Sequence, residues 1–390
     1  MREGVATRVR AQYERHPYPP VSPFALPSRV PERELSVTLG AELAGSRDFP
    51  RKPRVLVAGC GSLEALVVAR ANPEAEVVTA VDLSEASLRV LARRLVLARI
   101  AQPFTPRAPI VAHASDLLGF RSAPFDAIFL SNVLQHVAAP EQLLAHLASM
   151  LAPHGLMRLV VYPRASRLWM RAIQDHLRAI GLDAHGERPR ARVTAAMRAL
   201  DPSDPRRLSF EVNPESLTDA GVVDAYLHEH DDPVAPLTLA SCMHTCGMRL
   251  VAERQTASSR SSFVEEVDPA LAALVTSPWE RLAILDASLE LCANPVLWFA
   301  RGSSPEPARA SLDAMSTPTT LAERLGACVR ELDLLLAPYN YSTEAWLDRL
   351  AREVGPRVAP PPSERPLQGL ALSDYDVAAL RSGTPKLRDA

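Results

Sequence analysis

Apolar runs and amphipathic segments alternate between residues 51 and 163, and this alternation constrains the fold of the chain most strongly. The run "RVLVAG" (54–59) is followed by a helical segment at 62–71 and by "EVVTAVDL" at 76–83. Continuous apolar runs are typical of strands that are buried on both faces of a parallel sheet. Parallel strands joined by helices need right-handed crossovers, so the pattern predicts a doubly wound α/β fold.

The same alternation continues to residue 163. Ser84 is a good N-cap residue, and the leucines at helical spacing after it predict a helix that runs to about Arg99. A second helix is expected from Pro140 to Leu151, with a C-cap signal at Gly155. Further strands are expected at residues 109–118, 125–134 and 156–163.

The pattern loosens after residue 163 and then returns. Helical pieces are expected around 166–180 and 189–200, in a segment that is far longer than a plain crossover needs. The runs "RLVAER" (249–254) and "PVLWFAR" (295–301) predict two more strands, separated by a helix near 278–292.

These patterns and the proline clusters between them divide the chain into five units. We expect an N-terminal arm at 1–50, a core at 51–163, an inserted, mostly helical cap at 164–247, completion of the core sheet at 248–303 and a helical C-terminal appendage at 304–390. Within the appendage, Thr320 and Glu323 form a capping box before a helical leucine repeat.

Composition limits the partners. The formal net charge is −2, and the sequence pI is about 6.6; neither gives an overall attraction to nucleic acid or to an anionic membrane. No run approaches the roughly 18 apolar residues of a membrane span, and the N-terminal stretch has no apolar signal-peptide region. The five cysteines are scattered and form no secreted disulfide framework. We expect a cytoplasmic protein with reduced thiols, no nucleic acid partner and no membrane attachment.

Two glycines, Gly59 and Gly61, follow the first strand at the edge where open α/β sheets bind ligands. The third glycine of a dinucleotide fingerprint is absent, since Leu63 stands near its position. Asp82 ends the second strand, 21 residues after Gly61, where a carboxylate accepts hydrogen bonds from a ribose. The spacing favours an adenosine cofactor; the alternative is that Asp82 only caps the helix that follows.

Several segments agree in order and spacing with a known family. "VLVAGCGS", "VDLSEASL", "ASDLL" and the run from "FDAIFLSNVLQH" to "LMRLVVY" resemble class I S-adenosylmethionine-dependent methyltransferases over residues 51–163. "QYERHPYPP" (Gln12 to Pro20) resembles the YexxPYP lead-in of a bacterial branch of that family, and the likeness extends to about residue 254. The resemblance implies a seven-stranded Rossmann-like sheet, S-adenosylmethionine as the cofactor and methyl transfer to an acceptor.

The resemblance also implies a set of cofactor-binding residues: Gly59, Cys60, Gly61, Asp82, Leu83, Asp116 and Asn132. The glycine turn would line the methionine and the ribose, and Asp82 would bind the ribose hydroxyls. Leu83 would pack on the adenine, and Asp116 would accept from the adenine amino group. Leu63 departs from the family pattern, and its side chain would either crowd the carboxylate end of the cofactor or point into the core.

His136 is the best-placed catalytic candidate, because the resemblance places the segment from Asn132 to His136 beside the sulfonium and the substrate. Methyl transfer is an in-line displacement, so the protein aligns the nucleophile and excludes water. A hydroxyl nucleophile needs a base, and a histidine with a pKa near neutrality suits that role. The alternative is a histidine held by hydrogen bonds at a strand–helix turn. Gln135 stands where the branch commonly has a second histidine.

Six residues are candidate substrate contacts: Tyr18, Arg164, Arg167, Asp224, His228 and His230. Tyr18 lies in an arm that would close over the cofactor or pack on the sheet. The two arginines would grip an anionic acceptor or belong to solvated helix faces. The aspartate and the two histidines match a stretch of the branch's substrate-side insertion. Strict metal-ligand spacings are missing, so we expect a pocket wall and no metal, with a surface loop as the alternative.

The sequence leaves two functions open. The first is a methyltransferase that acts on a small molecule or a protein, with a homodimer as one arrangement. The second is a catalytically degenerate methyltransferase fold that serves as a binding or regulatory protein; Leu63 and the region 304–390 motivate it. A nicotinamide-dependent dehydrogenase is disfavoured, because the third glycine and a second nucleotide-binding half are absent.

Overall fold

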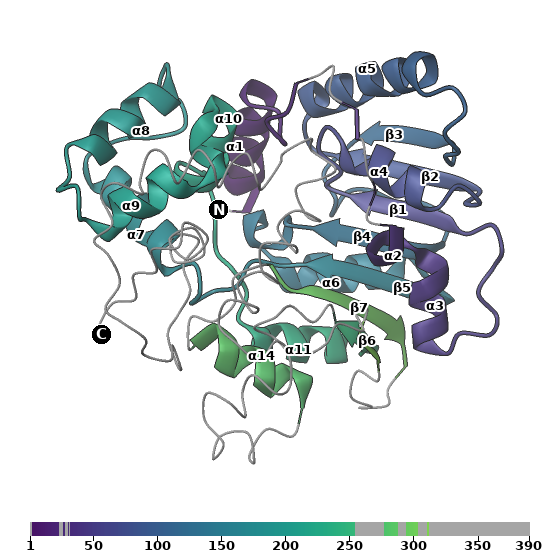
Figure 1. Cartoon of the computed structure of the whole chain (residues 1–390). Coiled ribbons are helices and arrows are strands. Elements are labelled where there is room, and N and C mark those ends of the chain that lie inside the picture. Colours follow the sequence, from purple (N-terminus) through teal and green to yellow (C-terminus); the bar gives the residue numbers. More distant parts are fainter. Residues whose placement is uncertain are drawn as a thin grey trace, which may run out of the picture.

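A mixed β-sheet runs through the centre of the molecule (Figure 1). The computed structural model describes residues 2–22, 26–27, 30, 32–253, 277–287, 294–302 and 310–311. The strands are β1 (Arg54–Ala58), β2 (Val77–Asp82), β3 (Ile110–Ala114), β4 (Phe125–Ser131), β5 (Leu151–Val160), β6 (Met248–Glu253), β7 (Val296–Arg301) and the short β8 (Ala310–Ser311). Their order is β3-β2-β1-β4-β5-β7-β6-β8, which confirms a doubly wound sheet of seven strands, extended by β8.

The direction of the strands creates a crevice at one edge. β1 pairs in parallel with β2 and β4, β3 and β5 continue this parallel set, and β7 is antiparallel to both β5 and β6. The strand order reverses between β1 and β4, whose last paired residues are Ala58 and Leu130. Open α/β sheets bind ligands outside the carboxyl ends of the strands at such a reversal.

Helices cover both faces of the sheet. One face carries α2 (Glu32–Leu35), α3 (Val37–Ala44), α4 (Glu64–Ala71) and α5 (Glu85–Ala101). The other face carries α6 (Pro140–Ser149), α11 (Pro236–Thr245) and α14 (Pro278–Ala287). Ser84 caps α5 as predicted, since its hydroxyl oxygen accepts from the amide of Ser87.

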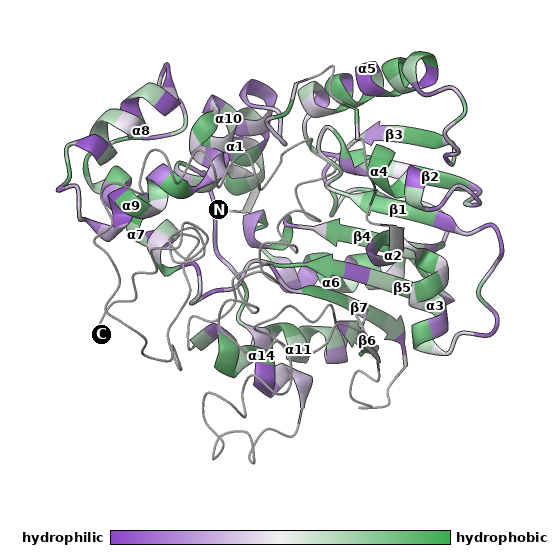
Figure 2. Cartoon of the chain, viewed as in Figure 1, coloured by the Kyte–Doolittle hydropathy of each residue, from purple (hydrophilic) through white to green (hydrophobic). Residues whose placement is uncertain are grey.

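The core explains the continuous apolar strands. Val55 and Val57 pack with the first helical layer, and Leu56 and Ala58 pack with the second; all four are fully buried. Figure 2 shows the resulting apolar colour along the central strands. Burial on both faces therefore gives β1 its unbroken apolar run, as expected for a parallel sheet.

The predicted cap forms a helical group of its own. It contains α7 (Leu168–Ala179), α8 (Pro189–Arg198), α9 (Pro205–Val212), the turn η2 (Pro214–Leu217) and α10 (Asp219–Tyr226). These elements share a separate apolar cluster, and Figure 1 shows them beside α1 (Arg2–Arg15). Helix α11 instead packs against α6 and β6. The boundaries at 164 and 247 stay predictions.

One local prediction is wrong. Gly155 ends no helix, because α6 ends at Ser149 and Gly155 lies inside β5. The pairing of β4 with β5 shifts between Phe125 and Ala127, and a Cβ on Gly155 would lie 2.8 Å from the carbonyl oxygen of Ala152. The glycine thus serves an irregular strand rather than a helix cap.

The structure describes only some of the residues for which helices are predicted beyond the sheet. The helix near 278–292 is seen as α14, up to Ala287. The capping box of Thr320 and Glu323, and all of the appendage except β8, lie outside the described residues. Within the described ranges, every helix is too short or too polar to cross a membrane.

A substitution at Gly40 tests the packing of α3 on the sheet. A Cβ at Gly40 would come within 2.8 Å of the ring of Trp298, a fully buried residue of β7. Alanine normally favours a helix over glycine, but overpacking costs about 1–3 kcal/mol. We expect Gly40→Ala to lower the midpoint of thermal unfolding. The control, Gly4→Ala in the exposed part of α1, should leave it unchanged or raise it, and a similar rise for Gly40→Ala would contradict this packing.

Candidate functional site

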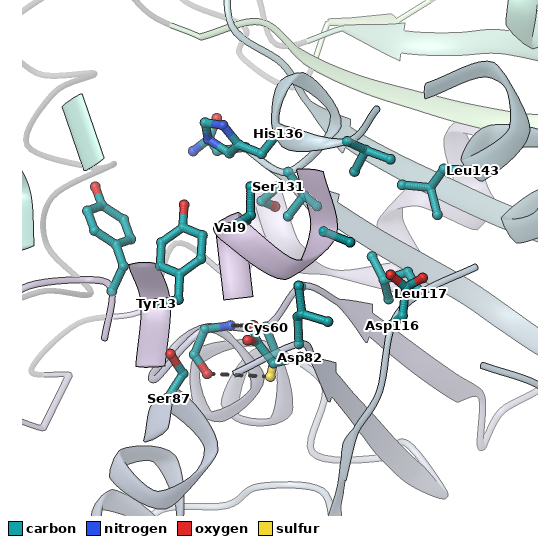
Figure 3. A pocket seen from close by; sticks show the side chains of 18 of the residues that line it. Val9, Tyr13, Cys60, Asp82, Ser87, Asp116, Leu117, Ser131, His136 and Leu143 are labelled. Carbon is teal, nitrogen blue, oxygen red and sulfur yellow. Dashed lines mark hydrogen bonds between the residues drawn. The ribbon is translucent and has the colours of Figure 1, made fainter. Parts of the chain in front are cut away.

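A cavity of about 330 Å³ opens at the carboxyl edge of the parallel strands, over the glycine turn (Figure 3). Its volume is in the range of ligand pockets, about 300–1,000 Å³. The arm, the sheet edge and helix α10 all contribute to its wall. The structure brings all seven predicted cofactor residues to this wall: Gly59, Cys60, Gly61, Asp82, Leu83, Asp116 and Asn132.

Both glycines of the turn are required by the space around them. Gly59 has φ +71°, and a Cβ there would collide with the side chain of Val133. Gly61 has φ +53°, and its Cβ would lie 2.8 Å from the carbonyl oxygen of Tyr18. Residues with side chains rarely adopt these angles. The turn therefore brings bare backbone to the cavity.

Leu63 does not narrow the cavity. Its side chain is 1% exposed and belongs to the apolar cluster between the sheet and helices α4 and α5. Its φ of −145° is an ordinary angle for a residue with a side chain, so no glycine is needed there. Of the two expectations for Leu63, the structure supports the one in which it points into the core.

Asp82 joins two turns at the cavity wall. Its Oδ2 accepts from the amide of Gly61 and its Oδ1 from the amide of Ser84, each at 2.8 Å. Burial raises the pKa of this carboxyl to about 6, and the two amides act against that rise. The helix cap itself is Ser84, so Asp82 does more than cap α5. It fixes the glycine turn against the end of β2.

The remaining predicted cofactor residues differ in their exposure. Asp116 is exposed at the rim, where its Oδ1 accepts from the amide of Leu118 at 2.7 Å. Asn132 has φ +54°, and its side-chain oxygen accepts from Asn294. Burial raises the pKa of the Cys60 thiol, so this cysteine is a neutral part of the wall rather than a nucleophile. Figure 3 shows Asp116 and Tyr13 on opposite sides of the cavity.

The N-terminal arm closes one side of the cavity. Five of its residues line the wall: Ala6, Val9, Tyr13, Tyr18 and Pro19. The carbonyl oxygen of Tyr18 accepts from the amide of Ser62 at 2.9 Å, and Glu14 accepts from the first amides of α5, at Glu85 and Ala86. A carboxylate is stabilised at this end of a helix. The arm thus touches the glycine turn and the helix after Asp82.

A buried arginine holds the arm to the turn. Arg94 of α5 is 0% exposed, and its guanidinium donates to the carbonyl oxygens of Ser62, Val21 and Ser22. It also donates to the Ser62 hydroxyl at 2.7 Å. A buried charge is tolerated when its donors are paired in this way. Arg94 therefore connects three segments that are far apart in the sequence.

At the other end of the cavity, Tyr13, Asp224 and His228 form a directional chain of hydrogen bonds. The amide of His230 donates to Nδ1 of His228 at 3.0 Å. An amide can only donate, so the proton of neutral His228 lies on Nε2 and is donated to the Tyr13 hydroxyl at 3.0 Å. Tyr13 in turn donates to Oδ1 of Asp224 at 2.8 Å. Asp224 and His228 are buried, Tyr13 is half-buried, and Tyr13 and Asp224 line the cavity.

His136 lies beside this chain in the turn η1 (Leu134–His136) and lines the cavity. Its Nδ1 donates to the carbonyl oxygen of His230 at 2.8 Å, so the lone pair is on Nε2, next to the side-chain amide of Gln135. Its ring stacks on His228 at 3.8 Å. Burial lowers the pKa of His136 to about 4. The imidazole is therefore neutral at pH 7, but it is a weaker base than the sequence led us to expect.

Three of these side chains resemble a metal donor set. The ligand atoms of His136, Asp224 and His228 lie within 4.8 Å of one another. However, Nε2 of His228 carries a proton and faces Tyr13, so it offers no lone pair to a metal ion. The geometry fits a hydrogen-bonded wall better than a metal centre.

Of the other candidate substrate residues, only Tyr18 lines the cavity. Its hydroxyl donates to Glu215 at 2.8 Å. His230 contributes backbone contacts to the two histidines. Arg164 is exposed, and its amide donates to Asp286; Arg167 lies over the ring of Tyr162 at 3.7 Å. Neither arginine lines the cavity.

Two wall residues were missed by the sequence reasoning. Glu64 begins α4, and its carboxyl accepts a hydrogen bond from the Ser131 hydroxyl at 2.5 Å. Burial raises the pKa of this carboxyl to about 7. Tyr162 follows β5 and packs edge-on against His136. The available signal was position, because both residues come directly after elements that end at this edge of the sheet.

Comparisons with known proteins point to a methyltransferase domain. Residues 56–157 match a family model described as a methyltransferase domain. The chain is 30% identical over 190 residues to an uncharacterised protein of Synechococcus, over 48% of this chain and 44% of that protein. It is 35% identical over 105 residues to a ubiquinone biosynthesis O-methyltransferase of Caulobacter, over 27% and 38%. The chain thus spans less than half the length of these curated relatives.

The fold also has a counterpart among solved structures. PKMT2 from Rickettsia typhi superposes with a TM-score of 0.54 at 12% identity, over 92% of this chain and 76% of that chain. At this identity the likeness shows the fold alone. Residues 56–157 thus match a methyltransferase domain, and the fold is one that PKMT2 shares; neither comparison identifies an acceptor.

The buried carboxyls predict how stability depends on pH. Burial raises the pKa of Glu64 and Glu215 to about 7 and that of Asp224 to about 8. In the unfolded chain they ionise near pH 4, and histidines titrate near 6.5. Above pH 7 the folded state therefore holds more protons, and its free energy of unfolding falls as the pH rises. We expect the thermal midpoint of the free protein to drop from pH 7 to 8.5, and Asp224→Asn to make this drop smaller. An equal slope in the variant would contradict the raised pKa of Asp224.

Proposed function

We propose that this chain is an S-adenosylmethionine-dependent methyltransferase whose cofactor lies in the cavity over the glycine turn. The observation that carries the proposal is the Asp82 carboxylate, which closes β2 and holds the turn of Gly59 and Gly61 at the strand-order reversal. The cofactor supplies a methyl group on a sulfonium. Bare backbone at the two glycines gives it room, because any Cβ there would fill the space.

Different residues of this chain contact different parts of the cofactor. Asp82 binds the ribose hydroxyls through the lone pairs that its two amide bonds leave free. Leu83 packs on the adenine, and Asp116 at the rim accepts from the adenine amino group. Cys60 and Asn132 line the methionine side. Leu63 was one reason to consider a degenerate binding protein, and its place in the core removes that reason.

His136 faces the nucleophile in this proposal. In the free protein its Nε2 lone pair accepts from the side-chain amide of Gln135 at 3.0 Å. The attacking group takes the place of this amide as the donor, while Nδ1 stays bound to the carbonyl oxygen of His230. A pKa of about 4 makes it a weak base, so orientation is its main contribution, with proton removal secondary. We keep Tyr18, Asp224 and His228 as the substrate wall.

The proposal also includes the family branch, the cellular compartment, the acceptor and the oligomeric state. The lead-in from Gln12 to Pro20 supports an assignment to the bacterial branch with the YexxPYP motif. The three cysteines within the described ranges, Cys60, Cys242 and Cys246, are free thiols, which suits the cytoplasm. A small molecule or a protein is the acceptor, and a homodimer stays a prediction.

Titration calorimetry with S-adenosylmethionine and S-adenosylhomocysteine tests the cofactor site. We expect micromolar binding, about −8 kcal/mol. Asp82→Asn should weaken it at least tenfold, because hydrogen bonds to a charged group contribute about 1.5–3 kcal/mol. Asp126→Asn is the matched control, since Asp126 accepts from the amide of Arg54 at the opposite end of β1. Absence of binding by the folded wild type would overturn the proposed function.

Substitution of His136 tests its role in turnover. With any acceptor that supports methyl transfer, His136→Ala should reduce kcat by about 10²-fold, at the lower end of the range for acid–base groups. The affinity for S-adenosylhomocysteine should change by less than about threefold, well under 1.4 kcal/mol. His146→Ala, in α6 and outside the cavity wall, is the control. An unchanged kcat would remove His136 from the reaction.

A further inference from the structure

The ionisable carboxyl groups of the cavity wall are not balanced by basic side chains. Among the described residues that line it there are four carboxylates, Glu64, Asp82, Asp116 and Asp224, and neither a lysine nor an arginine. A wall with acidic groups and no basic ones attracts cations and repels anions. Of the two expectations for Arg164 and Arg167, this favours helix faces outside the cavity over the binding of an anionic acceptor.

Three of the four carboxylates lie on the cofactor side. Asp82 and Asp116 are accounted for by the ribose and the adenine. Glu64 stands at the start of α4, next to the glycine turn that would hold the methionine. Asp224 is different, because it comes from α10 of the cap and meets Tyr13 and His228 at the other end of the cavity.

Asp224 offers one oxygen to a ligand. Its side chain is 6% exposed, and its Oδ1 accepts from Tyr13. Its Oδ2 has no hydrogen-bond partner among the described residues, although the residue lines the cavity. This oxygen is not one of the fully buried atoms that lack a partner, so it is open to the cavity, where a ligand with N–H donors can reach it.

The surroundings of Asp224 determine its protonation state. Glu215 accepts from Tyr18, Asp231 accepts from Gln174, and both carboxylates raise the pKa of Asp224. Arg167 acts in the opposite direction, but its guanidinium lies over the ring of Tyr162 rather than in the cavity. Together with burial, the two carboxylates keep Asp224 protonated at pH 7 in the free protein. A cation bound beside it would favour the carboxylate and release that proton.

Aromatic rings complete the acceptor end. Tyr13, Tyr18 and Tyr162 all line the cavity, and the hydroxyls of the first two are directed to Asp224 and Glu215. The faces of tyrosine rings attract ammonium groups. The Tyr162 ring already carries the Arg167 guanidinium, so Tyr13 and Tyr18 are the rings left for a bound cation.

We infer that the acceptor is an amine, bound as its ammonium ion with Asp224 as counter-ion. The inference rests on the proposed function. The ammonium gives one proton to Asp224 Oδ2, which frees the lone pair of its nitrogen. The nitrogen then attacks the methyl carbon; a C–N bond forms, the carbon–sulfur bond breaks, and its electron pair stays on the sulfur. The product leaves as a methylammonium ion, and Asp224 returns its proton to solvent.

Calorimetry on the full chain, saturated with S-adenosylhomocysteine, tests the acceptor class. The probes are n-hexylammonium, 1-hexanol and hexanoate, which share the apolar chain and differ in the head group. We expect hexylammonium to bind at least tenfold more tightly than hexanol, and hexanoate to bind more weakly than either. Asp224→Asn should abolish the preference for the amine. Asp219→Asn, at the exposed start of the same helix, should keep it.

The outcomes separate the two claims. If S-adenosylhomocysteine does not bind, the proposed function fails. If it binds, but hexylammonium and hexanol bind equally, hexylammonium does not bind, or the amine preference survives in Asp224→Asn, the inference of an amine acceptor fails alone. Transfer of labelled methyl from S-adenosylmethionine to hexylamine and not to hexanol would support both. Transfer to hexanol or hexanoate in place of the amine would overturn the inference.

Discussion

The carboxylate of Asp82 is the interaction on which the candidate site depends. It accepts one backbone amide from the glycine turn and one from the turn before α5, so the ends of β1 and β2 keep a fixed geometry. The arm is then seated on these same turns, through Ser62, Ser84 and Glu85. Loss of this one carboxylate would loosen the glycine turn under the cavity and also the turns on which the N-terminal arm is seated.

Charge is buried around the cavity in two different ways. Arg94 has donors paired with carbonyl and hydroxyl oxygens, so its charge is satisfied by the protein itself. The carboxyls of Glu64 and Asp224 have fewer donors, and burial shifts their pKa upward. A protein tolerates groups of the second kind where a ligand meets them, because perturbed pKa values gather at functional sites. Paired charges such as Arg94 hold the fold together, whereas the carboxyls with few donors, Glu64 and Asp224, face the cavity.

Much of the sheet and half of the site could be predicted from the sequence, for a physical reason. Val55 to Ala58 are buried on both faces, so their apolar run is a local signal, and Gly59, Gly61 and Asp82 stand at strand ends that share one edge. Gly155 carried a helix-cap signal, but tertiary pairing of β4 and β5 placed it in a strand. The pKa of His136 and the partners of Tyr13 depend on residues about 90 and 210 positions away, which no local pattern encodes.

The place of the N-terminal helix has a consequence for the order of folding. Tyr13 meets Asp224, 211 residues later in the sequence, and Gln12 accepts from the amide of Glu229 across 217 residues. Contacts this distant form late, because the loop between them must close first. Helix α1 therefore leaves the ribosome long before α10, the helix against which Tyr13 must dock. Until α10 has been synthesised and packed, Tyr13 lacks its partner Asp224, and the cavity has no far wall.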